Sequence, residues 1–198
     1  MKQFEEQTFD IPELVGMSKK SIEEHLKLYS GYVKNLNGIF EKLGELMADT
    51  TKNAYVIGEL HRRIGFEFNG MRNHEIYFSS LSGGAQALPE DSLFKKEIEK
   101  QAPSLEAAIM GFKTLAMTRG VGWAILYWDT QSKQFVAAWV DEQHVGQLQG
   151  CTPILALDMW EHSFVYDYQP SGKKQYIEDF FKNLNWSVIE ENFAKATK

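Results

Sequence analysis

Cysteine is almost absent from this chain: Cys151 is the only one among 198 residues. A single thiol excludes a framework of internal disulfides, the usual support of small secreted domains. No apolar run approaches the roughly 20 residues that a membrane-spanning helix needs, and the first residues, MKQFEEQTFDIPEL, lack the apolar core of a signal peptide. We therefore expect a cytoplasmic protein that does not act at a membrane.

Positive charge is also scarce. Lysine and arginine number 21 against 27 aspartates and glutamates, and the net charge of -6 is spread along the chain. The basic patch that attracts nucleic acids is missing, so we expect no nucleic-acid partner. Apolar residues make up 43% of the chain, which is enough for a buried core in one large or two small domains.

Two long helices are predicted in the first half of the chain. After Ser18, a plausible N-cap, apolar and aromatic side chains recur at three-to-four spacing, namely Ile22, His25, Tyr29, Tyr32, Leu36, Ile39, Leu43 and Met47. The polar break ADTTKN (48–53) precedes a second such pattern with Ile57, Leu60, Ile64, Met71, His74 and Phe78. Helices joined by so short a break form an antiparallel hairpin.

The second half has a mixed pattern. The segment LSGGAQALPEDS (81–92) reads as a loop and divides the chain into domains at 1–84 and 85–198. A helix is predicted over 104–119, and aromatic and β-branched runs at 122–129, 134–141 and 152–158 predict three strands. The remaining segment, from 160 to the C-terminus, has a helical pattern.

Two histidines lie on the predicted hairpin. His25 and His74 are almost symmetric about position 50, inside the turn, so they should face each other at the same height. A single histidine on an apolar helix face is more often a hydrogen-bonded core residue than a metal ligand. Two imidazoles that meet in an apolar region need a common partner, and a metal ion would supply one.

The stretch ILALDMWEHSF (154–164) offers two further donors. Asp158 ends a predicted buried strand, and His162 follows at a spacing that one helical turn would return to the same side. Taken alone, such a pair is more often a surface pair. Added to His25 and His74, it would complete a metal coordination sphere of three imidazoles and one carboxylate.

Several segments resemble the iron/manganese superoxide dismutase family. DMWEHSF (158–164) is similar to the family's signature, FNGMRNHEIYF (68–78) to its second-ligand helix, and GYVKNLN (31–37) to the end of its first helix. VGWAILYW (121–128) and the segment 167–186 extend the resemblance over nearly the whole chain. It implies an α+β fold: an N-terminal antiparallel helical hairpin followed by an α/β domain with a three-stranded antiparallel sheet.

The resemblance also implies an activity, the disproportionation of superoxide to oxygen and hydrogen peroxide at one iron or manganese ion per subunit. It makes four residues the metal ligands: His25, His74, Asp158 and His162. Trp123, Phe78 and Trp160 would form an apolar wall around the metal, and Tyr32 would stand at the substrate entrance. Lys173 falls where the family has an arginine near the substrate funnel.

A homodimer is a further implication. The resemblance places Glu161 at a two-fold interface, where it would accept a hydrogen bond from His162 of the partner subunit. Tyr29 and Val165 replace the residues that form another cross-subunit bond in the family. Glu161 should therefore matter more here than in the usual pattern.

Two positions depart from the family pattern. His25 and Tyr32 are seven residues apart, one fewer than usual, so Glu24 competes with His25 as the first ligand. We keep His25, because SIEEH (21–25) matches the family's upstream segment and an imidazole completes the pair with His74. The donor to metal-bound solvent is also open: Gly70 has no side chain at one of the family's two places, which leaves His144 as first candidate and Gln143 as second.

Other functions would use the same residues. A hydrolase would use a metal-bound hydroxide on zinc, and a metal-storage or interaction protein would keep the fold without turnover. The sequence is compatible with iron or manganese as the metal, and with a dimer or a tetramer as the assembly.

Overall fold

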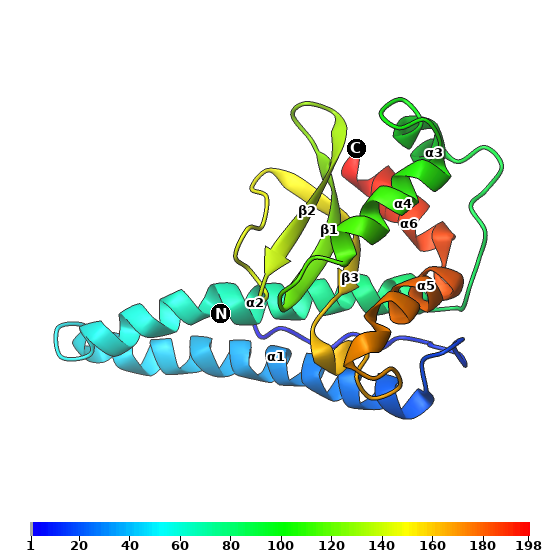
Figure 1. Cartoon of the computed structure of the whole chain (residues 1–198). Helices are drawn as coiled ribbons and strands as arrows, with labels where there is room; N and C mark the ends of the chain where they lie inside the picture. Colours follow the sequence, from blue (N-terminus) through cyan, green and yellow to red (C-terminus); the bar gives the residue numbers. More distant parts are fainter. Residues whose placement is uncertain (1) are drawn as a thin grey trace.

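A pair of 28-residue helices forms the base of the molecule (Figure 1). In the computed structural model, which describes residues 2–198, α1 (Lys19–Leu46) and α2 (Ala54–Leu81) are joined through the 3-10 turn η1 (Met47–Asp49). The Ser18 side chain accepts a hydrogen bond from the Ser21 backbone N–H at 3.2 Å and so caps α1. The predicted hairpin and its N-cap are confirmed.

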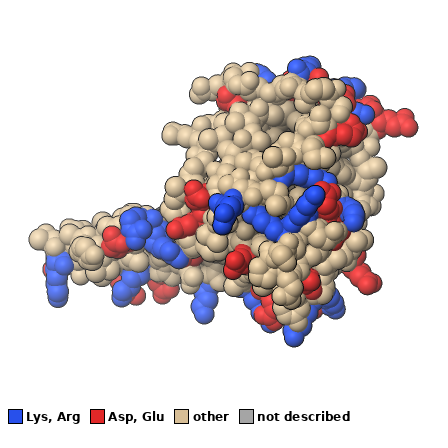
Figure 2. Space-filling model, in the orientation of Figure 1, with Lys and Arg blue, Asp and Glu red and all other residues tan. Residues whose placement is uncertain are grey.

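Burial along the hairpin is uneven. Its closed end extends beyond the rest of the molecule (Figure 1 and Figure 2), and there Met47, which the predicted stripe includes, is 58% exposed. At the other end Met71 and Phe78 are fully buried. The buried part of the hairpin therefore lies where the second half of the chain packs on it.

Three antiparallel strands form the sheet, in the order β2-β1-β3. They are β1 (Gly122–Asp129), β2 (Gln134–Asp141) and β3 (Cys151–Asp158), which confirms the three predicted strands with β3 one residue longer. The central strand β1 is buried along nearly all its length, as its continuous apolar sequence requires. Its register sets Trp123 opposite Asp158 at the end of β3.

Helices cover the sheet on the side away from the hairpin. They are α3 (Leu93–Ile98), α4 (Leu105–Ala116) and α6 (Trp186–Ala196), with α5 (Lys173–Asn183) beside the open end of the hairpin (Figure 1). The short helix α3 was not predicted, and α4 is shorter than its predicted range. Among residues 2–198, no helix combines the length and apolar character needed to cross a bilayer.

The prediction of a helix directly after residue 160 is wrong. Residues 160–168 form the short 3-10 helix η2 (Glu161–Ser163) and turns, followed by η3 (Pro170–Gly172) before α5 begins. The Ser163 hydroxyl donates to the carbonyl of Trp160, and the Asp158 carboxylate accepts the Trp160 N–H. These local side-chain bonds compete with a regular helix, so His162 approaches Asp158 through a tight turn.

Candidate metal centre

The four predicted ligand residues meet at one point. His25 comes from α1, His74 from α2, Asp158 from the end of β3 and His162 from η2, and one donor atom of each lies within 4.8 Å of the others. The Nε2 atoms of His25 and His162 are each 3.1 Å from Asp158 Oδ2, and that of His74 is 3.6 Å away. Glu24, the competing residue, is exposed and pairs with Lys27.

The hairpin explains how the first two residues meet. The ring centroids of His25 and His74 are 4.9 Å apart, as their symmetry about the turn predicted. His25 and Tyr32 are seven residues apart, which is two turns of α1, so they share one face of the helix. The Tyr32 ring lies 5.0 Å from that of His74. The shorter spacing thus keeps both side chains at the centre.

His74 has one ring nitrogen without a partner. Its Nδ1 lies 2.6 Å from the Gly70 carbonyl oxygen, and because a carbonyl only accepts, Nδ1 carries the hydrogen. Nε2 then offers a lone pair, and it is buried with no hydrogen-bond partner among the described residues. Burial, followed by the nearby His25, lowers the pKa of His74 to about 3. The ring is therefore neutral at neutral pH, the form that binds metal.

The charge of the cluster also fits a cation. Asp158 is fully buried. Burial by itself raises the pKa of a carboxyl group, but His162 and His25 outweigh it and hold the pKa of Asp158 below its usual value. Because the His74 ring is neutral, it cannot compensate the negative charge of this buried carboxylate, whereas a metal cation would. Three imidazole nitrogens and one carboxylate oxygen form a donor set suited to iron or manganese.

Asp158 is held from three sides. Its Oδ1 accepts the backbone N–H of Trp160 at 2.8 Å, and its backbone carbonyl accepts a hydrogen bond from the Tyr176 hydroxyl at 3.0 Å. The Ser163 hydroxyl lies 3.0 Å from the same carbonyl and shares its one hydrogen between it and the Trp160 carbonyl. These contacts fix the carboxylate with Oδ2 toward the imidazoles. Tyr176 was missed from the sequence, because nothing in α5 indicates a contact with a strand 18 residues earlier.

Aromatic rings surround the imidazoles, and three of them belong to the residues proposed for the apolar wall. Trp123 packs against His74 at 5.0 Å between ring centroids, Phe78 against His25 at 4.9 Å, and Trp160 stacks on His162 at 5.8 Å. Trp123 and Phe78 are fully buried, whereas 24% of the His162 side chain is exposed. The centre is therefore dry on most sides and faces solvent beside His162.

Gln143 connects two of the predicted site residues. Its side chain is fully buried; its Oε1 accepts the indole N–H of Trp123 at 2.8 Å, and its Nε2 donates to the Tyr32 hydroxyl at 2.9 Å. Its backbone carbonyl accepts from the Asn73 side chain at 3.1 Å, directly beside His74. Gln143 is thus held by hydrogen bonds to the sheet and to both helices of the hairpin.

His144 has different surroundings. Its ring packs edge-on against Phe66 at 5.9 Å and lies 3.2 Å from the position that a Cβ on Gly65 would take. Its Nδ1 is buried and has no partner among residues 2–198. Of the two predicted donor candidates, Gln143 contacts Tyr32 and Trp123.

Glu161 and Lys173 lie outside this network. Glu161 is exposed at the start of η2, and its side chain forms no hydrogen bond or ion pair with residues 2–198. The Lys173 ammonium donates to the Thr118 carbonyl at 2.7 Å and lies 5.5 Å from the centre of the Trp139 ring. Burial lowers the pKa of Lys173.

A helical hairpin and a three-stranded sheet that together bring three histidines and one aspartate to one point define a class of metal-binding proteins. Residues 15–82 match the model described as "Iron/manganese superoxide dismutases, alpha-hairpin domain", and residues 90–192 match the C-terminal domain of the same family. The chain belongs to the iron/manganese superoxide dismutase family.

Curated relatives include proteins named for either metal. Superoxide dismutase [Fe] of Aquifex pyrophilus is 38% identical over 190 residues, which are 93% of this chain and 88% of that protein. The corresponding iron protein of Cupriavidus metallidurans is 34% identical, with 93% and 92% covered. Superoxide dismutase [Mn] of Mycobacterium leprae is 29% identical, with 87% and 82% covered. The relatives thus include both iron and manganese proteins.

Proposed function

We propose that this chain is a superoxide dismutase that holds one iron or manganese ion with His25, His74, Asp158 and His162. The observation that carries the proposal is the buried Asp158 carboxylate, with three imidazole nitrogens around it and one of them, His74 Nε2, otherwise unpartnered. When bound, the ion supplies the one-electron change by which one superoxide is oxidised to oxygen and the next is reduced, with two protons, to hydrogen peroxide.

We propose that Tyr32 donates a proton to the reaction and that Gln143 orients the Tyr32 hydroxyl for this. Because the Trp123 indole N–H only donates, the amide oxygen of Gln143 faces it and the amide nitrogen faces Tyr32. The Tyr32 oxygen accepts that bond and keeps its own proton available to another acceptor. Burial raises the pKa of Tyr32 above its usual value, so the phenol stays protonated at neutral pH.

We propose that Gln143, and not His144, is the hydrogen-bond donor to solvent at the metal site. Gln143 is joined to Tyr32 and Trp123, whereas His144 packs against Phe66. Trp123 is proposed to orient the Gln143 amide and to exclude water from the imidazoles. The positive charge of Lys173 is proposed to attract the anionic substrate to a chain that is acidic overall.

A homodimer is part of the proposal, with Glu161 reaching His162 of the partner subunit. Its support is the exposed part of the His162 side chain and the exposed, unpaired Glu161 beside it. Apolar Val121 is also exposed, and it lies near Trp160, because the Glu142 N–H donates to the Val121 carbonyl and the Glu142 carbonyl accepts the Trp160 indole N–H. A second subunit would cover this surface.

We also propose a domain boundary and a cellular location. The division into domains at 1–84 and 85–198 is supported by the two family matches, which end at 82 and begin at 90. A cytoplasmic location is supported by the single unpaired Cys151, which suits a reducing compartment.

One purified sample tests the function, through metal analysis and superoxide consumption measured together. We expect about one iron or manganese ion per chain, the stoichiometry of a single four-donor set, and rapid loss of superoxide. Asp158→Ala should lack both metal and activity, whereas Asn35→Ala on the outer part of α1 should keep both. Full activity of Asp158→Ala without bound metal would refute the proposal.

A further inference from the structure

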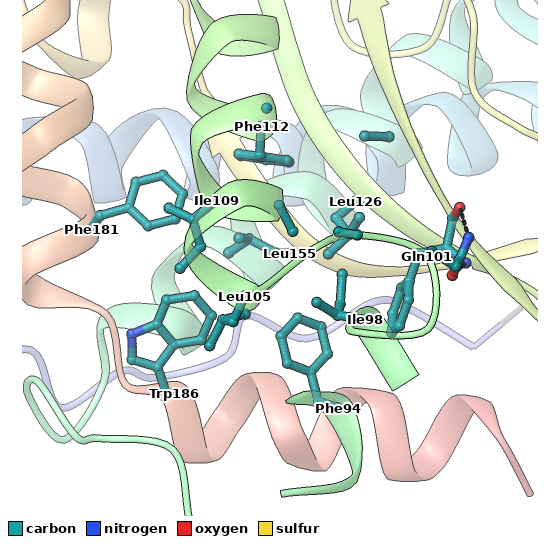
Figure 3. Close-up of a pocket in the computed structure, with 15 residues that line it drawn as sticks. Phe94, Ile98, Gln101, Leu105, Ile109, Phe112, Leu126, Leu155, Phe181 and Trp186 are labelled. Carbon is teal, nitrogen blue, oxygen red and sulfur yellow. Dashed lines mark hydrogen bonds between the residues drawn. The ribbon is translucent and has the colours of Figure 1, made fainter. Parts of the chain in front are cut away.

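A second concave site lies on the other face of the sheet. Trp123 and Leu126 are three residues apart on β1, so their side chains lie on opposite faces: Trp123 packs on His74, and Leu126 lines a cavity of about 300 Å³. Figure 3 shows side chains from α3, α4, the sheet and the corner between α5 and α6 pointing into this space. The cavity is therefore separate from the metal centre.

The cavity has an uncharged, apolar lining. Its inner walls include buried Phe94, Phe112 and Leu155, and none of its lining residues is Asp, Glu, Lys, Arg or His. Besides the Trp186 indole, the only polar lining side chain is Gln101, and it is occupied by the backbone of Phe135: its Nε2 donates to the carbonyl at 3.2 Å and its Oε1 accepts the N–H at 2.8 Å (Figure 3). A charged molecule would lose its hydration here without gaining a partner.

Small residues keep the space open. Ala102, Ala108, Gly111 and Ala137 all line the cavity, and a Cβ added to Gly111 would meet no atom within 4 Å. Protein interiors are normally close-packed, and an unfilled cavity is destabilising. Larger side chains at these positions would fill it. Gln101, Gly111 and Ala137 are exposed, which gives the cavity a mouth at the surface.

We propose that this cavity binds an uncharged, predominantly apolar small molecule. An apolar cavity of about 150 Å³ is enough to hold benzene, so the present one suits an aliphatic chain of about eight carbons or a small aromatic system. The driving force is the burial of apolar surface, with one polar end of the ligand left at the mouth. This site does not depend on the proposed dismutase activity.

A ligand series measures the binding on the full, metal-loaded chain. The neutral dye 1-aminoanthracene should gain fluorescence when it enters the cavity, and n-alcohols from hexanol to nonanol should displace it. Affinity should rise about fourfold for each added methylene until the cavity is full. The matched ligand 1,8-octanediol should displace far less dye than n-octanol, because its second hydroxyl would be buried without a partner.

Two variants fill the cavity, and a third is the control. Ala108→Phe and Gly111→Leu should each weaken displacement by n-octanol by more than about tenfold, since each fills the volume of several methylenes. Ala107→Phe, an exposed neighbour on α4, should bind as the unmodified chain does. Superoxide consumption should be unchanged in all three.

Three outcomes would overturn the proposal. The first is no dye binding by the unmodified chain. The second is binding that survives in both Ala108→Phe and Gly111→Leu, which would place the dye elsewhere on the surface. The third is binding that falls as protein concentration rises, which would show that a second copy of the chain, not a small molecule, covers the mouth.

Discussion

Gln143 and His144 are adjacent residues, but we expect their substitution by alanine to affect turnover differently. Gln143→Ala removes the donor to Tyr32 and leaves the Trp123 indole N–H buried without its acceptor. We expect metal content to be retained and turnover to fall about 10- to 100-fold, the usual effect of losing a hydrogen-bond partner next to a metal site. Turnover and the midpoint potential of the bound metal are the measurements.

His144→Ala is the matched variant. Its ring contacts Phe66 and no predicted ligand, so its turnover should change by no more than about twofold, as for substitutions away from critical contacts. A large shift of potential in His144→Ala, with none in Gln143→Ala, would return the donor role to His144.

At the scale of the elements, periodicity was enough to predict most of the framework. The two helices of the hairpin and the three strands follow from the spacing of apolar residues, which local structure and burial impose directly. The pairing of His25 with His74 followed from the hairpin, because an antiparallel turn fixes which positions face each other.

The parts that were missed depend on contacts that periodicity does not carry. The turn at 160–168 has a helical apolar pattern, but hydrogen bonds of Asp158 and Ser163 override it. The sequence left Gln143 and His144 as alternatives, and our proposal of Gln143 rests on its contacts with Tyr32 and Trp123. The ligand assignment itself needed the family resemblance, because the spacing left Glu24 open beside His25.

Two glycines on α2, Gly70 and Gly58, allow the effect of side-chain packing to be separated from that of helix propensity. A Cβ on Gly70 would lie 2.5 Å from Cδ1 of Tyr32, so Gly70→Ala must displace the Tyr32 ring. We expect turnover to fall, and by the same amount as we expect for Tyr32→Phe, because in both variants the Tyr32–Gln143 hydrogen bond is lost. The position of the Tyr32 ring in a crystal structure of the variant, together with turnover, checks this.

Gly58→Ala is the control within the same helix. A Cβ there meets nothing within 4 Å, so only helix propensity changes. The free energy of unfolding should rise by up to about 1 kcal/mol, with turnover unchanged. Normal turnover in Gly70→Ala would mean that the Tyr32 ring moves without functional effect.

Assembly is the first question at the scale of the whole molecule. If Glu161 accepts a hydrogen bond from His162 of the partner subunit, Glu161→Ala leaves two such partners uncompensated in each dimer. Breaking a buried pair of this kind costs roughly 3 to 5 kcal/mol, so we expect dissociation at low protein concentration and a loss of metal and activity. Light scattering and metal analysis on one dilution series measure both.

The control for this variant is Glu191→Ala, which removes an exposed carboxylate that pairs with Lys195 on α6. It should leave mass, metal and activity unchanged. A Glu161→Ala protein that stays dimeric, fully metallated and fully active would show that Glu161 is only a surface charge.

The four residues of the metal centre come from both halves of the chain, so their protonation affects the stability of the whole fold and makes that stability depend on pH. Without metal, burial holds the pKa of His74 at about 3, whereas the unfolded chain binds that proton near the ordinary value of about 6.5. Between these values the unfolded state carries more protons, so stability falls as the pH falls. His25, whose pKa burial also lowers, contributes in the same direction.

We therefore expect the free energy of unfolding of the metal-free protein to decrease steadily from pH 7 to pH 5. The slope should approach about 1.4 kcal/mol per pH unit for each proton that only the unfolded state binds. His74→Leu removes one such proton and should flatten the slope, while His61→Asn, at an exposed position of α2, should not change it. Denaturant titrations at several pH values measure the slope, and equal slopes for the unmodified chain and His74→Leu would show that His74 is already charged in the folded, metal-free state.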